Sequence, residues 1–218
     1  MKRIFAALLI LSLLLPALSE GDLKPGDSVL FGRYEQAGIS ENGPEPIEWV
    51  VISVSQDDAL LLSRYALTVL PYNDVYKPVT WESSLLRACL NGEFYETAFD
   101  EDEKKRVLLC EVSADRNRQY ATDPGNPTRD AVFLVSSAEV LKYLSRNDLK
   151  FCRPTRYACL TAGRAENGEC CIWWLRSPGM NPSCAAAISA NGMLQNGKVD
   201  YPAYFVRPAI RIPARWDE

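Results

Sequence analysis

The chain has 218 residues, of which 47% are hydrophobic and 24% charged, with a formal net charge of −4, seven cysteines and no histidine. This composition is typical of a globular protein and excludes a disordered, a collagen-like and a multi-pass membrane protein. The lack of histidine excludes histidine-activated nucleophiles, histidine-ligated zinc and haem held by a histidine, and it removes the commonest general base near neutral pH.

Residues 1–19 have the layout of a secretory signal peptide. Lys2 and Arg3 form a basic start, an apolar run extends from Ile4 to Leu15, and Ala17-Leu18-Ser19 places small residues at the cleavage positions. The run is shorter than the roughly 20 residues that cross a membrane. We therefore expect cleavage near Glu20 and a secreted, extracellular protein that is not membrane-spanning; a retained signal anchor is the alternative.

Cleavage would leave residues 20–218, which we expect to form a single α+β domain. Without the two basic residues of the signal peptide, the mature chain carries 22 basic and 28 acidic residues. We do not expect duplex nucleic acid as a partner, because affinity for its phosphates needs a basic face.

Three runs rich in β-branched and aromatic residues predict strands at Ser28–Tyr34, Ile47–Val54 and Ala59–Arg64. The second run is apolar on both faces, so we expect it to lie at the centre of a sheet and to be covered on each side. The link between the second and third runs is short enough for a hairpin, which predicts antiparallel pairing.

Three helices are predicted from their starts. Thr80 is placed to cap a helix that ends at Gly92, and the acidic segment Asp100–Glu103 resembles a capping box for a helix running to about Leu109. A second capping box, Ser136–Glu139, opens a helix through Leu144. A calcium site in the acidic segment is the alternative, but the glycine turn and alternating ligands of a calcium loop are missing, and no metal is expected.

The C-terminal half is predicted to be mostly strand. A polar stretch with two prolines and a glycine predicts a loop over Asp115–Asp130. The strands expected after it are Val132–Val135, Cys171–Leu175, Ala185–Ser189 and Tyr204–Ile212, with a hairpin turn at Asn191-Gly192. Strands, then helices, then strands indicate an α+β fold with a mostly antiparallel sheet and about three helices.

The seven cysteines are expected to be small packing residues with one or two disulfides among them, because an exported chain meets an oxidising environment. Their odd number leaves at least one thiol unpaired, and no C-x-x-C spacing occurs. The neighbours Cys170 and Cys171 would point to opposite faces of a strand, so they are not expected to pair with each other. The connectivity stays open.

Several segments, taken together and in order, resemble a large uncharacterised domain family of exported and surface proteins from Gram-positive anaerobes. They are Val29–Tyr34, Ile47–Val51, Thr80–Arg87, Leu90-Asn91, Phe94-Tyr95, Ala98-Phe99, Val132–Ser136, Thr155, Tyr157-Ala158, Trp173–Gly179 and Val206–Ile210. The most specific signatures are Trp-Trp-Leu-Arg-Ser-Pro and Val-Arg-Pro-Ala. This resemblance implies a fold and no activity, because the function of that family is unknown.

The ending is also similar in outline to C-type-lectin-like domains of the formylglycine-generating-enzyme branch. That similarity implies a compact α+β domain whose terminal strands come together, with a loop-rich face that displays binding residues. The Glu-Pro-Asn and Trp-Asn-Asp calcium motifs of sugar-binding C-type lectins are absent, so calcium-dependent sugar binding is not implied. The copper-binding cysteine pair of the enzyme cannot be placed here, so its oxidase activity is not implied either.

The candidate ligand-binding residues lie in the C-terminal third: Trp173, Trp174, Arg176, Asn196, Tyr201, Tyr204 and Arg207. Adjacent tryptophans in a strand place one indole on each face, and an exposed indole offers an apolar plate with an N–H at its edge. Arginine binds anions through paired contacts. The structural alternative is that both indoles belong to the core and that both arginines bond loop carbonyls.

No serine-hydrolase, phosphate-loop or dinucleotide-binding motif is present. The sequence therefore predicts a non-catalytic binding domain without a cofactor, whose ligand is a glycan, a cell-wall component or a surface protein. The alternative is an exported enzyme that acts on glycans with two carboxylates, for which histidine is not needed. A purely structural domain is the third hypothesis.

Overall fold

The computed structural model describes residues 21–38, 43–117, 119–144 and 148–216. The predicted signal peptide lies outside these residues. Within them, no helix combines the length and the apolarity that crossing a bilayer requires.

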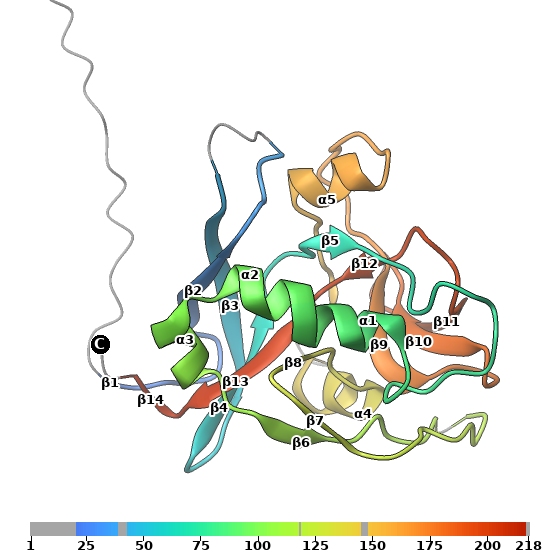
Figure 1. Cartoon of the computed structure of the whole chain (residues 1–218), viewed down its shortest axis with the longest axis horizontal. Helices are drawn as coiled ribbons and strands as arrows, with labels where there is room; N and C mark the ends of the chain where they lie inside the picture. The colour runs from blue at the N-terminus through green and yellow to red at the C-terminus, as the bar shows by residue number, and fades with distance from the viewer. Residues whose placement is uncertain (1–20, 39–42, 118, 145–147, 217–218) are drawn as a thin grey trace, which may run out of the picture.

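Two five-stranded sheets form the framework (Figure 1). The first sheet has the order β2 (Ser28–Tyr34), β3 (Glu45–Val54), β4 (Asp58–Ser63), β13 (Ala209–Pro213) and β8 (Val132–Phe133). The second has the order β11 (Leu194–Lys198), β10 (Cys184–Ile188), β9 (Trp173–Pro178), β12 (Phe205–Val206) and β5 (Thr68–Val69). Two short pairs complete the strands: β1 (Gly21–Asp22) with β14 (Arg215–Trp216), and β6 (Cys110–Val112) with β7 (Thr128–Asp130).

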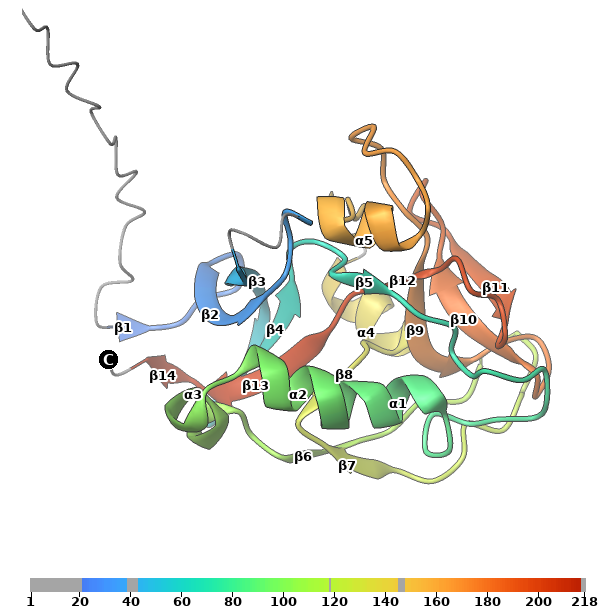
Figure 2. The ribbon, with the colours of Figure 1, turned by 45° about the horizontal axis from the view of Figure 1, so that its top comes forward.

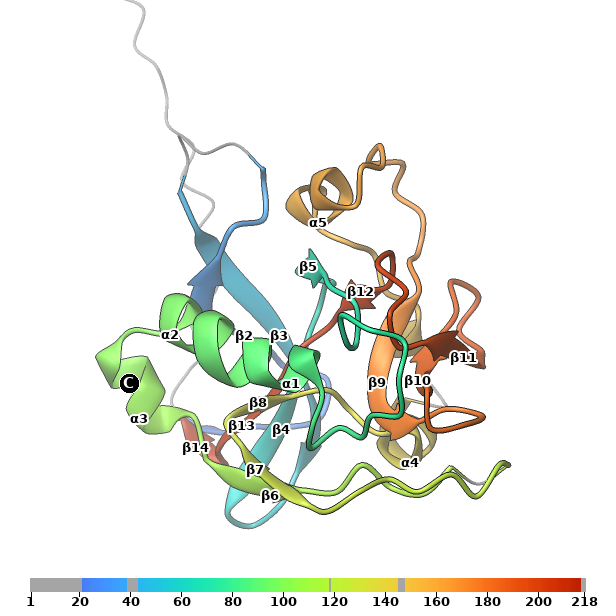
Figure 3. The same ribbon diagram turned by 45° about the vertical axis from the view of Figure 1, so that its right-hand side comes forward.

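The helical segments are short and lie around the sheets. They are α1 (Leu85–Cys89), the π-helical turn η1 (Leu90–Phe94), α2 (Tyr95–Ala98), α3 (Glu101–Arg106), α4 (Ser137–Glu139), the π-helical turn η2 (Val140–Leu144), the 3-10 turn η3 (Asp148–Lys150) and α5 (Arg156–Thr161). Figure 3 shows the continuous stretch α1-η1-α2 in front of the first sheet, with the second sheet on the other side of the molecule. The α+β class and the mostly antiparallel pairing are confirmed.

The second predicted strand, β3, is covered as expected but is not the middle strand of its sheet, since it lies between the edge strand β2 and β4. The residues from Trp49 to Ile52 are all buried, which confirms that β3 is covered on both faces. Phe99, just after α2, stacks on Trp49 with ring centroids 6.4 Å apart. The pairing of β3 with β4 is antiparallel, as the short link between them predicts.

The first predicted helix begins and ends elsewhere than expected. Ser84, not Thr80, is the N-cap, because its hydroxyl accepts the backbone N–H of Arg87 at 3.1 Å. Gly92 does not end the helix but lies inside η1, and the helical stretch continues to Ala98. A glycine inside a helix costs up to about 1 kcal/mol relative to alanine. Burial of the following Phe94 and Ala98 offsets that cost.

Both capping boxes are confirmed. The Asp100 side chain accepts the backbone N–H of Glu103 while the Glu103 carboxylate accepts that of Asp100, although α3 ends at Arg106 rather than near Leu109. Ser136 and Glu139 form the same reciprocal pair at the start of α4. In each case the signal is local, since the partners are three residues apart.

The end of the chain is two strands where one was predicted. Phe205–Val206 pairs in the second sheet, whereas Ala209–Pro213 pairs in the first, and Arg207-Pro208 joins them. Figure 2 shows this segment running between the sheets. Pro208 has no backbone N–H, so it cannot continue a hydrogen-bonded ladder in the middle of a sheet. The predicted polar loop also contains a strand, since Thr128–Asp130 pairs with Cys110–Val112.

All seven cysteines are free thiols in the structure, so the predicted disulfides are not present in it. Cys152, Cys159, Cys171 and Cys184 are buried, and the others are partly exposed. Burial is the main cause that raises the pKa of the Cys110 and Cys184 thiols, which makes both less reactive as thiolates.

Candidate functional site

Both tryptophans of the predicted ligand surface belong to the core. Trp173 and Trp174 have no exposed surface. The indole N–H of Trp173 donates to the carbonyl oxygen of Lys150 at 3.1 Å, and that of Trp174 donates to the carbonyl oxygen of Leu70 at 3.0 Å. The expectation of an exposed indole plate is therefore corrected, because β9 is covered on both faces and each indole nitrogen is satisfied inside the protein.

Arg176 is an internal tie rather than an exposed anion-binding group. Its Nε donates to the carbonyl oxygen of Ser113 at 2.8 Å, and its Nη1 donates to that of Leu134 and to the Glu139 carboxylate, both at 2.6 Å. Glu139 is also the capping-box residue of α4. One buried guanidinium thus joins β9, α4 and two loops.

Arg207 is buried as well, at the point where the chain passes from the second sheet to the first. Its guanidinium donates to the carbonyl oxygens of Ser63, Leu149 and Arg64, and it lies 5.0 Å from the ring centre of Trp173. Burial lowers the pKa of this guanidinium. Both Arg176 and Arg207 therefore hydrogen-bond to backbone carbonyl oxygens, as the structural alternative to ligand binding predicted.

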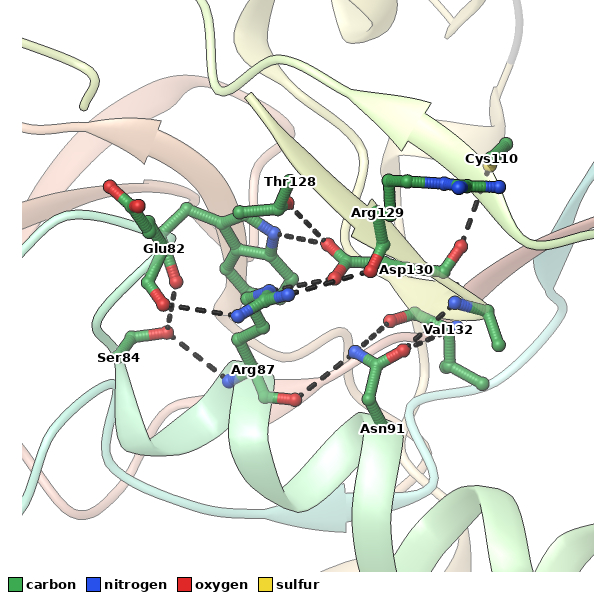
Figure 4. Close-up of polar contacts among 11 residues, drawn as sticks. Glu82, Ser84, Arg87, Asn91, Cys110, Thr128, Arg129, Asp130 and Val132 are labelled. Atoms are coloured by element: carbon green, nitrogen blue, oxygen red, sulfur yellow. Dashed lines mark hydrogen bonds and ion pairs between the residues drawn. The ribbon is translucent and has the colours of Figure 1, made fainter. Parts of the chain in front are cut away.

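A buried carboxylate that the sequence reasoning missed organises the first helix (Figure 4). Asp130 is fully buried, and its Oδ2 accepts the indole N–H of Trp81 at 2.8 Å and the hydroxyl of Thr128 at 2.7 Å. Its Oδ1 accepts Nε of Arg87 at 2.6 Å. The sequence places two hydrogen-bond donors near each other, the indole of Trp81 just before α1 and the guanidinium of Arg87 within it. Nothing in the local sequence identifies Asp130 as their common acceptor.

Asn91 continues this network along the same helical stretch. Its side-chain oxygen accepts the backbone N–H groups of Ala131 and Val132, at 2.8 and 3.2 Å. Its amide nitrogen donates to the carbonyl oxygens of Val132 and Arg87. Figure 4 shows that this network and the ion pair of Asp130 lie side by side between α1 and the β7-β8 segment.

Five tryptophans and arginines from the segments that carry the resemblance therefore hold the fold together. Trp81, Arg87, Trp173, Arg176 and Arg207 all have their polar atoms bonded to the protein itself. A ligand must consequently meet other side chains, those that the sheets and loops present to solvent.

One such place is the tyrosine surface, which we define as Gln195, Tyr201 and Tyr204. Tyr201 is 44% exposed, and its ring lies 4.9 Å from that of the half-buried Tyr204 at an interplanar angle of 69°. The side-chain amide of Gln195 donates to the Tyr204 hydroxyl at 3.2 Å. Burial, followed by the nearby Tyr201, raises the pKa of Tyr204, so this hydroxyl stays protonated and neutral at neutral pH.

The tyrosine surface rests on a series of aromatic rings that reaches into the core. Tyr204 lies 4.5 Å from Trp174, which lies 5.7 Å from Tyr72, which in turn lies 6.2 Å from Trp81. Such pairs contribute about 0.5–1.5 kcal/mol each beyond the area they bury. The predicted Trp174 thus supports Tyr204 from below instead of contacting a ligand.

A missing side chain lets Tyr204 approach β11. A Cβ added at Gly197 would lie 2.5 Å from Cε2 of Tyr204 and 2.7 Å from Cη2 of Trp174. We expect Gly197→Ala to displace Tyr204 and to lower the free energy of unfolding by about 1–3 kcal/mol, the cost of overpacking. Urea unfolding of this variant beside Gly92→Ala, where an added Cβ meets nothing within 4 Å, measures the effect. Equal midpoints for the two variants would contradict this account.

Asn196 is separated from the tyrosine surface by the alternation of β11. Gln195 pairs with Ala187 and so shares a face with Trp174, whereas Asn196 pairs with Ala186 on the other face. Of the seven predicted ligand residues, the structure brings only Tyr201 and Tyr204 together near solvent.

An open groove of about 530 Å³ lies between β2, β3 and the start of α5. Its lining includes the exposed Leu30 and Tyr65 and the carboxylates of Glu45, Glu48 and Glu166. Glu45 already accepts the backbone N–H of Gln36 at 2.8 Å, and Glu48 is paired with Arg64 at 2.5 Å. Two of the three carboxylates therefore have structural partners, which does not favour the two-carboxylate enzyme.

Among the residues that the structure describes, no three histidine, cysteine, aspartate or glutamate side chains are grouped so that they could hold a metal ion. The acidic segment that the sequence analysis weighed as a calcium site is instead the start of α3, where Asp100 caps the helix. Asp102 is paired with Lys105 at 2.7 Å, which lowers the pKa of this carboxyl.

Comparison with known proteins gives one family. The profile described as Domain of unknown function (DUF6273) matches residues 56–214, which is well over half of the chain. No curated protein and no solved structure matches the chain.

Proposed function

The chain belongs to the DUF6273 family of domains of unknown function, and we propose that it is an exported, non-catalytic binding domain whose tyrosine surface recognises a glycan of the cell wall or cell surface. The observation that carries the proposal is the pair of tyrosines at the end of the aromatic series. Tyr201 is exposed, while Tyr204 is held in place by Trp174 and Gln195.

The chemistry of this surface suits a sugar. A sugar ring offers C–H groups on one face and hydroxyls at its edge, and a tyrosine offers an apolar ring with a polar tip. The Gln195 amide adds a hydrogen-bonding group beside the rings. Next to them, the carbonyl oxygen of Lys198 accepts the backbone N–H of Tyr201, and the Lys198 ammonium lies 5.6 Å from the ring centre of the exposed Tyr76. Because Tyr204 is already packed, little side-chain entropy is lost when a ligand binds.

The arrangement of the termini supports the lectin-like part of the proposal. β1 and β14 pair antiparallel, with Gly21 opposite Trp216, so the two ends of the described chain lie side by side (Figure 2). We propose a C-type-lectin-like domain on this ground, with calcium-independent binding through side chains that the C-terminal strands display.

The proposal is tested with the mature chain, residues 20–218. We expect it to be retained by insoluble peptidoglycan or by a surface polysaccharide, and we expect Tyr201→Ala to weaken retention about tenfold, equivalent to about 1.4 kcal/mol of binding free energy. Tyr65→Ala is the matched control, because Tyr65 is similarly exposed at 39% but lies in the groove beside β3.

Equal retention of the wild type and Tyr201→Ala would reject the tyrosine surface. Binding to whole cells that is lost when the cells are treated with protease would indicate a surface protein as the partner and reject the glycan. Recovery of full-length protein inside the cells, with residues 1–19 still attached, would reject export.

A further inference from the structure

Two of the buried thiols lie against each other. The backbone N–H of Cys171 donates to the carbonyl oxygen of Cys152 at 2.7 Å, so the two segments run side by side at this point. Only 1% of Cys152 and 5% of Cys171 is exposed, and the Cys152 thiol lies 3.5 Å from the carbonyl oxygen of Arg153. These residues are 19 positions apart in the sequence, and it is the path of the chain through α5 and back that brings them together.

The surroundings shift the pKa values of the two thiols in opposite directions. Burial by itself raises the pKa of Cys152, but the hydrogen bond from Cys171, the positive Arg207 and a backbone hydrogen bond at Ala66 outweigh it, so the pKa is lowered. Burial and the neighbouring Cys152 raise the pKa of Cys171. In the described part of the chain no carboxylate forms an ion pair with Arg207, whose donors are bonded to carbonyl oxygens.

The pair can be reached from solvent on one side. A cavity of about 420 Å³ is lined by Cys171, by the half-exposed Cys170 and by Cys159, with the exposed Arg164 and Glu169 at its polar edge. Of the two paired cysteines, Cys171 is therefore the one that lines the cavity, whereas Cys152 does not line it.

We propose that Cys152 and Cys171 are a cross-linking site that closes to a disulfide by exchange with a low-molecular-weight disulfide entering this cavity. First, the Cys171 thiol loses its proton, its sulfur bonds to one sulfur of the oxidant, and the other sulfur leaves and takes up a proton as a thiol. Then the Cys152 sulfur bonds to that of Cys171 and expels the second thiol. The two protein thiols give up two electrons and two protons, and the oxidant leaves as two reduced thiols.

The cross-link would enclose a segment that lines part of the groove beside β3 and part of the thiol-lined cavity. The closed ring contains α5 and the loop that follows it, and therefore Arg156 and Glu166 of the groove beside β3 as well as Arg164 of the thiol-lined cavity. Closing a ring in the unfolded chain removes part of its conformational entropy, so the oxidised protein should be the more stable form. This inference is independent of what the tyrosine surface binds.

The test is peptide mapping of the full mature chain after incubation with oxidised glutathione, alkylation of the remaining thiols and cleavage with trypsin. Trypsin separates the relevant cysteines into three peptides. Residues 151–156 contain Cys152, residues 157–164 contain Cys159, and residues 165–176 contain the adjacent Cys170 and Cys171. We expect one cross-linked species of 151–156 with 165–176, and its fragmentation should place the bond on Cys171. The urea midpoint should rise on oxidation and fall again with reductant.

Cys170→Ser is the matched control, since it removes the neighbouring thiol and should leave both the cross-link and the shift in midpoint intact, whereas Cys171→Ser should abolish both. The wild-type map tests the proposal even if a variant does not fold. Alkylation of Cys152 and Cys171 after oxidation of the folded wild type, or a bond from Cys152 to Cys170 or Cys159, would overturn it.

Discussion

Replacing Asp130 with alanine is expected to lower the free energy of unfolding by about 3 kcal/mol, measured by urea unfolding. The carboxylate is fully buried and accepts hydrogen bonds from Trp81, Arg87 and Thr128. Removing one partner of a buried pair costs about 3–5 kcal/mol, because the other charge is left without compensation. We expect the lower end of this range, because the Arg87 side chain is 27% exposed and water can partly solvate its charge once Asp130 is removed.

Asp102→Ala is the control for this prediction. Asp102 also forms an ion pair, with Lys105 at 2.7 Å, but both side chains of that pair are solvent-exposed. We expect the urea midpoint of Asp102→Ala to match that of the wild type, because exposed ion pairs contribute little to the free energy of unfolding. Asp130→Asn should fall between wild type and Asp130→Ala, since the amide oxygen can still accept one of the bonds. If Asp130→Ala unfolds at the wild-type midpoint, the network in Figure 4 does not hold the helix to β7.

Replacing Trp174 with alanine is expected to lower the free energy of unfolding by about 4 kcal/mol. Truncation of a buried aromatic side chain costs about 3–5 kcal/mol through lost contacts and the cavity that remains. The change also leaves the carbonyl oxygen of Leu70 without its indole donor and removes the ring 4.5 Å from Tyr204. Tyr204 would lose its support, so binding at the tyrosine surface should weaken together with stability.

Two further variants separate these effects. Trp174→Phe keeps a ring behind Tyr204 and should cost less than Trp174→Ala, while Tyr201→Ala should lose binding with little change in the urea midpoint because Tyr201 is exposed. A Trp174→Ala protein as stable as the wild type would show that the aromatic series does not contribute the expected free energy of unfolding. Reduced binding in Trp174→Ala alone would not identify Trp174 as a ligand contact, since the indole is internal.

Several of the residues singled out by the sequence, together with Asp130, thus serve mainly to hold the fold together. Arg176 bonds two loops and a capping glutamate, Arg207 bonds three carbonyl oxygens, and Asp130 bonds a tryptophan and an arginine. Buried polar groups of this kind have strict geometry, because each unmet donor or acceptor costs about 1–3 kcal/mol. The proposed ligand contact Tyr201 differs from these groups because it is exposed, so we expect its substitution to change stability little.

The amino-acid sequence by itself determined the α+β class, the three N-terminal strands, the burial of β3 and the capping boxes at Asp100 and Ser136. These features depend on side chains within a few residues of one another, so alternation and cap spacing suffice to predict them. Tertiary structure alone decided that Trp173 and Trp174 are internal, that the last predicted strand divides between two sheets at Pro208, and that Asp130 meets Trp81. The reason is that burial and hydrogen-bond partners depend on elements far away in the sequence: Asp130 lies 49 residues from Trp81 and 43 from Arg87, and a local sequence pattern carries no information about such contacts.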